Sequence, residues 1–288
     1  MRGMQSQQIL TTAKHFPGHG DTDADSHKTM PLISASKNRI DTLELYPYKY
    51  LINKNLTGVM VAHLSVPALE KNTALPSTLS PKIITDLLRN DLRFNGLIFT
   101  DALNMKGVSA YYPDGEIEVR ALLAGNDVLL FTEDVPVAIN AIKKAIAEGR
   151  LNEKIINDRC YRILLAKSWM KVPERNHVNE ENLYNDLHKK EFLQLNKKLI
   201  QASITVVKDD KRVLPFRNLD KTNIAIVSFG NSKTFRKWCA KYTNEAFVIS
   251  SNGEESAAEL DRIKKELQKY STVILEVQGT SMYAKKNY

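Results

Sequence analysis

Short apolar runs that alternate with helical patterns constrain the fold of this chain more than any other feature. Continuous apolar runs predict buried strands at residues 58–63, 96–101 and 127–131, and the run Ile9–Ala13 predicts the end of another. The helical patterns between and after these runs cover residues 40–52, 80–92, 135–148 and 152–170. Strand–helix repeats of this kind are typical of a parallel α/β fold.

The loops that follow the predicted strands carry most of the unusual polar residues, whereas the loops before them are short. This asymmetry favours a β/α barrel, in which the chemistry gathers at the carboxyl ends of the strands. We find about four β/α units before residue 171, half of the eight that a complete barrel needs. The repeats therefore predict part of a (β/α)8 TIM-type barrel at residues 1–172.

A second, separate α/β region follows the barrel segment. Polar residues around Pro173 predict a linker, and residues 181–202 show the pattern of one long helix, so we assign 173–202 to a linker and interdomain helix. The range 203–288 then predicts part of an α/β sandwich domain that stops just after a strand. Its predicted strands are residues 203–207, 223–227, 247–249 and 272–277, with helices at 232–241 and 254–269.

Charge and composition restrict the partners of the chain. The net charge is +8, and more of the excess lies after residue 170. No nucleic-acid recognition motif accompanies it, so we expect a solvated basic face and no nucleic-acid partner. The longest apolar stretch, residues 58–69, is short and contains His63, so no membrane span is expected. Cys160 and Cys239 are expected to be core thiols, and the compartment stays open between the cytoplasm and the cell envelope.

The segment Lys14–His27 is the most unusual in the chain, with three of its six histidines and three aspartates. A metal site is one interpretation, but Pro17 and Gly18 exclude a helix between the first two histidines. The aspartates also resemble the start of a calcium loop, yet Ser26 stands where that loop needs glycine. A solvated polar loop is a second interpretation, and an acid/base and substrate-binding loop, which we favour, is a third.

One side-chain pair carries the acid/base interpretation, and a single aspartate forms a second candidate site. Asp25 and His27 are two residues apart, so in an extended segment both project to one side, and the carboxylate can orient the imidazole and raise its pKa. Asp101 directly follows an apolar strand and is expected at its carboxyl end. An aspartate at such a junction also commonly caps a helix, which is the structural alternative for Asp101.

Three stretches together resemble glycoside hydrolase family 3, and in particular its β-N-acetylhexosaminidase branch. They are Lys-His-Phe-Pro-Gly-His-Gly-Asp-Thr at 14–22, Asp-Ser-His at 25–27, and Ile-Phe-Thr-Asp-Ala-Leu-Asn-Met at 98–105. The run Gly58–His63 is similar to the next strand and loop of the family, and residues 203–207 and 213–216 to the entry of its second domain. The resemblance is dense over residues 1–170.

The resemblance implies a retaining glycosidase that removes terminal β-linked N-acetylglucosamine from carbohydrates such as peptidoglycan fragments, with no cofactor or metal. The aspartate at the position of Asp101 is the nucleophile in this family, and the pair at Asp25 and His27 provides the acid/base. The resemblance assigns substrate binding to Lys14, His15, Met105 and His63.

The first half of the family's barrel has no counterpart here, so the resemblance implies the second half of a barrel within a longer enzyme. We expect the isolated chain to be inactive, and to be completed by an upstream half-barrel or by self-association. Two rival functions remain. One is an N-acetylglucosaminide phosphorylase of the same branch, because a neutral imidazole does not repel phosphate. The other is a catalytically silent fragment or interaction module.

Overall fold

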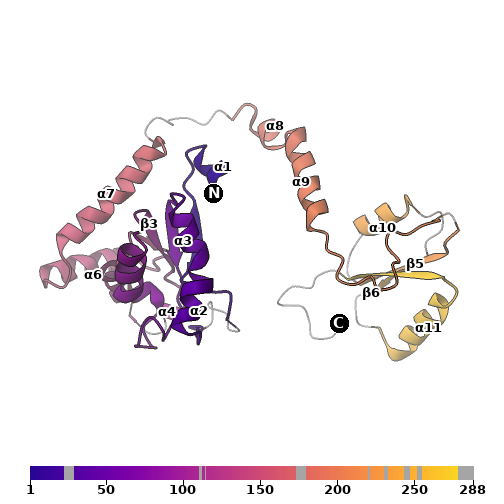
Figure 1. The fold of residues 1–288 in the computed structure, drawn as a ribbon, viewed down its shortest axis with the longest axis horizontal. Helices are drawn as coiled ribbons and strands as arrows, with labels where there is room; N and C mark the ends of the chain where they lie inside the picture. Colours follow the sequence, from indigo (N-terminus) through magenta and orange to yellow (C-terminus); the bar gives the residue numbers. More distant parts are fainter. Residues whose placement is uncertain are drawn as a thin grey trace. The chain divides into compact units, whose positions relative to one another are not determined.

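The computed structural model describes residues 1–22, 29–109, 112–113, 115–172, 180–219, 221–229, 233–242, 247–251 and 255–277. The chain divides into two compact units, Met1–Glu181 and Asn182–Tyr288 (Figure 1). The finer division expected from the sequence, with boundaries at residues 172 and 202, stays a prediction.

A parallel four-stranded sheet forms the centre of the first unit, which confirms the α/β class. Its strands β1(Thr12–Phe16), β2(Gly58–Val61), β3(Leu97–Ala102) and β4(Val128–Leu130) lie side by side in chain order. Every neighbouring pair is parallel. All four carboxyl ends therefore meet at one edge of the sheet, where the loops with the unusual residues begin.

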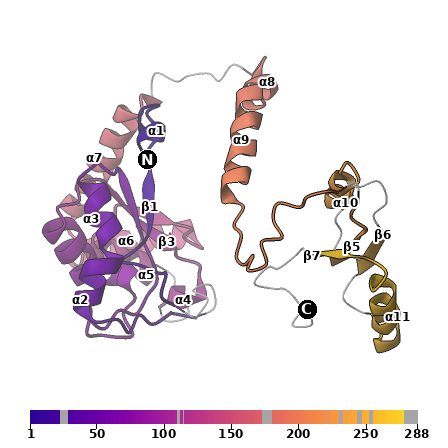
Figure 2. The same cartoon turned by 45° about the vertical axis from the view of Figure 1, so that its right-hand side comes forward.

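Helices connect these strands as the alternation predicts (Figures 1 and 2). The pattern at residues 40–52 becomes two consecutive helices, the first of them π-helical, and the pattern at 80–92 becomes one π-helix that begins after Pro81. Several short helices were not expected, and the longest of these is α5. The helices of the unit are α1(Arg2–Gln5), α2(Lys37–Arg39), η1(Ile40–Glu44), α3(Tyr46–Ile52), η2(Ser77–Leu79), η3(Lys82–Asp91), α4(Lys106–Ser109), α5(Glu116–Ala124), α6(Val135–Ala147) and α7(Glu153–Trp169).

The main core lies between one face of this sheet and the helices. Val59, Val61 and Ile98 are fully buried there, and they belong to one cluster with apolar side chains of η1, α3 and η3. Side chains alternate along a strand, so Met60 and Phe99 project from the opposite face, where they are only partly buried. The sheet thus has one face covered by helices and one less covered face, as a segment of barrel wall has.

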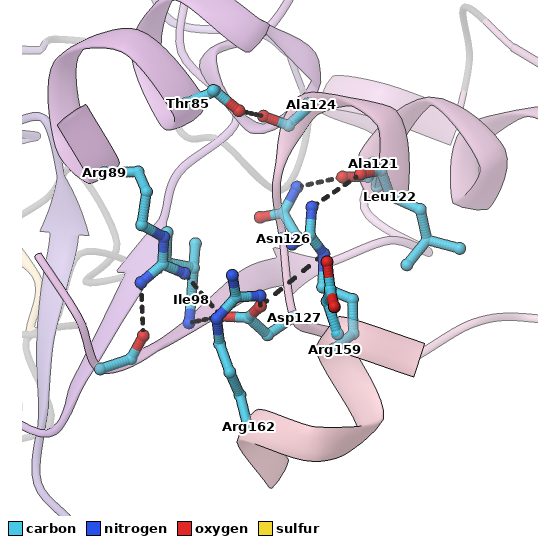
Figure 3. Close-up of polar contacts among 12 residues, drawn as sticks. Thr85, Arg89, Ile98, Ala121, Leu122, Ala124, Asn126, Asp127, Arg159 and Arg162 are labelled. Atoms are coloured by element: carbon cyan, nitrogen blue, oxygen red, sulfur yellow. Dashed lines mark hydrogen bonds and ion pairs between the residues drawn. The ribbon is translucent and has the colours of Figure 1, made fainter. Parts of the chain in front are cut away.

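A buried ionic cluster lies at the opposite, amino edge of the sheet (Figure 3). Asp127 precedes β4, and its carboxylate is completely buried. Its Oδ2 accepts from the Ile98 N–H at 2.9 Å and from Arg89 of η3 at 2.8 Å. Its Oδ1 accepts from Arg162 of α7 at 3.1 Å and lies 3.7 Å from Nε of Arg159. One carboxylate therefore links β3, η3 and α7.

The second unit contains a parallel sheet of β5(Ile224–Phe229), β6(Phe247–Ser251) and β7(Thr272–Val277), in the order β6-β5-β7. These strands confirm three predicted runs, but the strand predicted at residues 203–207 does not form. The long helix predicted at 181–202 is interrupted at His188 and Lys189. The helices of this unit are α8(Leu183–Leu187), α9(Lys190–Ser203), α10(Lys233–Cys239) and α11(Ala257–Leu267).

Two further expectations concern cysteines and membranes. The prediction of core thiols is wrong, because Cys160 is exposed and Cys239 is only partly buried. Cys160 lies on α7, none of whose residues is buried, and an apolar residue type alone does not reveal which side of a helix faces solvent. In the part of the chain that the structure describes, no helix has the length and apolarity to span a membrane.

Candidate active site

The carboxyl edge of the first sheet brings together residues that are far apart in the sequence. Lys14 and His15 lie in β1, and Asp101 lies near the end of β3. The strand between them, β2, pairs its Val61 with Phe16 on one side and with Thr100 on the other. His15 and Asp101, each one residue from these partners, therefore approach each other at the end of β2.

An irregularity in β1 determines where Lys14 and His15 lie. Ala13 pairs with Val59 and Phe16 pairs with Val61, so β1 uses three residues over a length in which β2 uses two. Ala13 and Phe16 both pack against the core. The extra residue therefore leaves Lys14 and His15 as a pair between two core contacts, and both line a cavity of about 410 Å³ at this edge.

The carboxylate of Asp101 lies beside His15 at this edge. Its Oδ1 accepts from the Ala102 N–H at 2.9 Å, and its Oδ2 lies 3.8 Å from Nε2 of His15. The Asp101 side chain is 14% exposed and that of His15 is 29% exposed. A partly buried carboxylate with one oxygen held by a backbone amide is oriented while it keeps access to a ligand at the sheet edge.

The loop after β1 adds further polar groups beside these residues. The rings of His15 and His19 meet edge to face, with centroids 5.8 Å apart. His19 Nδ1 is 2.8 Å from the Thr22 hydroxyl, and Asp21 pairs with Arg39 at 3.3 Å. Asp25 and His27, predicted as the acid/base pair, lie outside the described residues, so their role stays a prediction.

His63 occupies a different place from the one that the sequence suggested. Its ring has no exposed surface, and its two nitrogens face protein oxygens: Nε2 is 2.9 Å from the Ala102 carbonyl and Nδ1 is 2.8 Å from the Thr78 hydroxyl. Direct contact with a substrate, as predicted for His63, needs exposed ring atoms. His63 lies behind the site, and the prediction of a substrate contact is corrected accordingly.

Met105 is the last of the residues predicted to bind substrate. Met105 lies in the turn after β3, is 8% exposed, and donates its N–H to the Ala102 carbonyl at 3.1 Å. Its predicted place in the sugar pocket stays a prediction.

The described residues contain no cluster of three or more histidine, cysteine, aspartate or glutamate side chains that could hold a metal ion.

Sequence reasoning missed Thr78. This buried residue lies in η2, and its hydroxyl contacts the carbonyls of Val61 and Ala62 as well as His63. A threonine between Pro76 and Pro81 looks like an ordinary loop residue, and only the packing of η2 against the end of β2 reveals its contact with the histidine. No local pattern in the sequence could have identified it.

Comparisons with known proteins agree with this arrangement. Residues 1–166 match the family model described as the N-terminal domain of glycosyl hydrolase family 3. The chain is 30% identical over 244 residues to beta-hexosaminidase A of Pseudoalteromonas piscicida, an alignment that covers 76% of this chain and 39% of that protein.

Two solved structures are also similar to the chain. A glycoside hydrolase family 3 beta-N-acetylglucosaminidase from Paenibacillus sp. str. FPU-7 has a TM-score of 0.81 and 30% identity, over 95% of this chain and 54% of that one. A beta-glucoside phosphorylase has a TM-score of 0.73 and 26% identity, over 100% of this chain and 50% of that one. The chain thus spans about half the length of these relatives or less.

Proposed function

Because the chain belongs to glycosyl hydrolase family 3, we propose that it carries the nucleophile half of a retaining β-N-acetylhexosaminidase site. Its first unit is part of a TIM-type barrel, whose strands present side chains at one rim. The substrate class is a terminal β-linked N-acetylglucosamine. The names of the hexosaminidase relatives support this sugar, and fragments of peptidoglycan are the natural source that we propose.

The position of Asp101 is the observation that carries the proposal. Its carboxylate lies at the carboxyl edge of β3, is 14% exposed, and is 3.8 Å from His15. The backbone amide of Ala102 fixes one carboxylate oxygen, which leaves the other as the attacking atom. A nucleophile needs this combination of a held orientation and an accessible oxygen.

The reaction that we propose has two steps. The Asp101 carboxylate attacks the anomeric carbon, the bond to the leaving oxygen breaks, and His27 gives that oxygen a proton while Asp25 stabilises the imidazolium. A water molecule, deprotonated by His27, then attacks the same carbon and releases Asp101. Lys14 and His15 bind hydroxyls of the sugar, and Met105 contacts its apolar face.

A phosphorylase of the same family is the second candidate. The 26% identity to a beta-glucoside phosphorylase over the whole chain supports it. In this variant phosphate replaces water in the second step, and a histidine acid/base is compatible with the anion because a neutral imidazole does not repel it. The product is then a sugar 1-phosphate, and the covalent bond to Asp101 breaks in the same way.

An assay with an aryl β-N-acetylglucosaminide tests the proposal. We expect negligible turnover by the 288-residue chain alone and measurable turnover when the chain is fused to the remaining barrel segment of the Paenibacillus relative. The same fusion with Asp101→Ala is the control and should be inactive. Sugar 1-phosphate formed on addition of phosphate would favour the phosphorylase, and an inactive fusion would favour a catalytically silent module.

A further inference from the structure

The end of β2 lies against the residue that follows Asp101. In the parallel register Val61 pairs with Thr100, so two residues further along each strand His63 reaches the level of Ala102. The contact that results joins His63 Nε2 to the Ala102 carbonyl oxygen at 2.9 Å. The ring is wholly buried, so this contact is shielded from water.

The hydrogen-bond partners determine the protonation of the ring. A carbonyl oxygen only accepts, so Nε2 must carry the proton that it donates to Ala102. In a neutral ring Nδ1 then accepts, and the Thr78 hydroxyl at 2.8 Å is its donor. The Thr78 hydroxyl also contacts the Ala62 carbonyl, to which Ser77 donates as well at 2.7 Å, so Thr78 lies between two acceptors, this carbonyl and Nδ1.

Electrostatics agree with a neutral ring. Burial lowers the pKa of His63, and the positive charge of a protonated His15 acts in the same direction. The hydrogen bond to Ala102 and the negative charge of Asp101 oppose this shift without overcoming it. A ring that stays neutral near pH 7 keeps one donor and one acceptor, which is what Ala102 and Thr78 require.

The backbone of Ala102 connects His63 to the proposed nucleophile. Its N–H donates to Oδ1 of Asp101 at 2.9 Å, and its carbonyl accepts from both His63 and the N–H of Met105. The N–H and the carbonyl belong to the two peptide groups on either side of the Ala102 Cα, so the backbone conformation of Ala102 links the His63 contact to the position in which the Asp101 carboxylate is held. His63 is the side chain that fixes this backbone from behind.

We propose that His63 is a positioning residue that holds the backbone of Ala102, and through it the Asp101 carboxylate, in the orientation for attack. The inference rests on the proposed role of Asp101 and adds a function for a residue that touches no substrate. Thr78 supports it by accepting the Asn126 side-chain N–H at its own carbonyl, 2.9 Å away, so the partner of Nδ1 is itself fixed within the buried interior.

Two variants of His63 separate positioning from packing. His63→Gln places an amide N–H near the position of Nε2 and can still donate to the Ala102 carbonyl, whereas His63→Leu fills a similar volume without a donor. We would measure hydrogen exchange of the Ala102 and Met105 amides in the 288-residue chain. The Ile98 amide lies in the same strand as Ala102 and donates to Asp127. It is the internal control for a general destabilisation of the fold.

The proposal predicts that His63→Leu accelerates exchange at Ala102 and Met105 roughly tenfold more than at Ile98, as loss of one buried hydrogen bond implies. His63→Gln should restore most of the protection. If His63→Leu does not fold, Thr78→Val tests the same link with His63 in place and should accelerate the same two amides. Equal changes at all three amides, or no difference between the Leu and Gln variants, would overturn the proposal.

A second measurement keeps this inference distinct from the proposed function. In the barrel-completed fusion, the rate at which a mechanism-based fluorosugar labels Asp101 should fall about tenfold in His63→Leu and recover in His63→Gln. An unchanged labelling rate in His63→Leu counts against positioning. If the parent fusion is never labelled at Asp101, the proposed function fails, while the amide exchange still decides whether His63 holds the backbone of Ala102.

Discussion

Replacing Asp127 by asparagine tests how α7 is attached to the barrel segment. The carboxylate of Asp127 is completely buried and faces three arginines, so the cluster carries a net charge of +2 when all four groups are charged (Figure 3). Arg89 and Arg159 are each 16% exposed, and Nε of Arg159 is buried without a hydrogen-bond acceptor. Asp127→Asn keeps the shape of the side chain but leaves these guanidinium groups without a counter-charge.

The expected cost is about 3–5 kcal/mol in the free energy of unfolding, as for the loss of one partner of a buried ion pair. The hydrogen bonds give a similar figure. Arg89 and Arg162 donate to Asp127 at 2.8 and 3.1 Å, and a hydrogen bond to a charged group contributes about 1.5–3 kcal/mol. Arg162→Met should cost less, about 1 kcal/mol, because Arg89 and Arg159 still pair with the carboxylate.

Urea unfolding followed by tryptophan fluorescence measures these costs. The chain has two tryptophans, Trp169 at the end of α7 and Trp238 in the second unit. In a Trp238→Phe background the signal reports on the first unit alone. With a slope of about 2 kcal/mol per molar urea, Asp127→Asn should lower the midpoint by about 2 M.

Asp158→Asn is the matched control, since it removes the same charge from the exposed side of α7, where Asp158 pairs with Lys154 and lies near Arg159 and Arg162. It should lower the midpoint only slightly, because an exposed pair of this kind contributes about 0.3–0.5 kcal/mol. A midpoint that Asp127→Asn shifts no more than this control does would refute the reasoning. So would an Arg162→Met variant that is as unstable as Asp127→Asn.

Four further predictions concern the site and the sheet edges. In the barrel-completed protein, Asp101→Ala should cost on the order of 5 kcal/mol of transition-state stabilisation, measured as kcat/KM. His27→Ala should impair substrates with poor leaving groups far more than activated aryl glycosides, and Asp25→Asn should show the same pattern more weakly; equal losses would argue against an acid/base role. Burial lowers the pKa of His63; the charge of His15 adds to this shift and that of Asp101 opposes it. Below about pH 6.5 the unfolded chain therefore binds a proton at this histidine more readily than the folded chain does. Urea titrations should therefore show stability falling as the pH drops below that value, a dependence that His63→Gln should remove. Since β1 and β4 each have a neighbour on one side only within the described part of the chain, light scattering should find the isolated chain self-associated, and a monomer would contradict this.

The sequence predicted the secondary structure best where several local signals agreed. The apolar runs at 58–63 and 96–101 formed the parallel strands β2 and β3, because the strands of parallel sheets have continuous apolar sequences. The run at Ile9–Ala13 misplaced β1, which is Thr12–Phe16, because the strand continues through Lys14 and His15. These polar residues belong to the site, and a pattern based on hydropathy excludes them from a strand.

Other errors have different physical causes. The β-branched run Ile204–Val207 favours a strand, but no strand among the described residues pairs with it, and Val207 is 93% exposed. Helix α5 was missed although Gly115 and Glu118 mark its start, with Glu118 accepting from the Gly115 N–H at 2.9 Å. Within the site, the position of Asp101 at the sheet edge could be predicted because it directly follows an apolar run. The burial of His63 depends on η2, whose packing leaves no local signal.

Covalent labelling of Asp101 tests the central claim most directly. The barrel-completed fusion would be treated with a mechanism-based fluorinated N-acetylglucosaminide, digested, and examined by mass spectrometry for the modified peptide. The account predicts a single sugar adduct on Asp101, absent from the Asp101→Ala variant. An active fusion whose adduct lies on another residue, or on none, would contradict the assignment of Asp101 as the nucleophile.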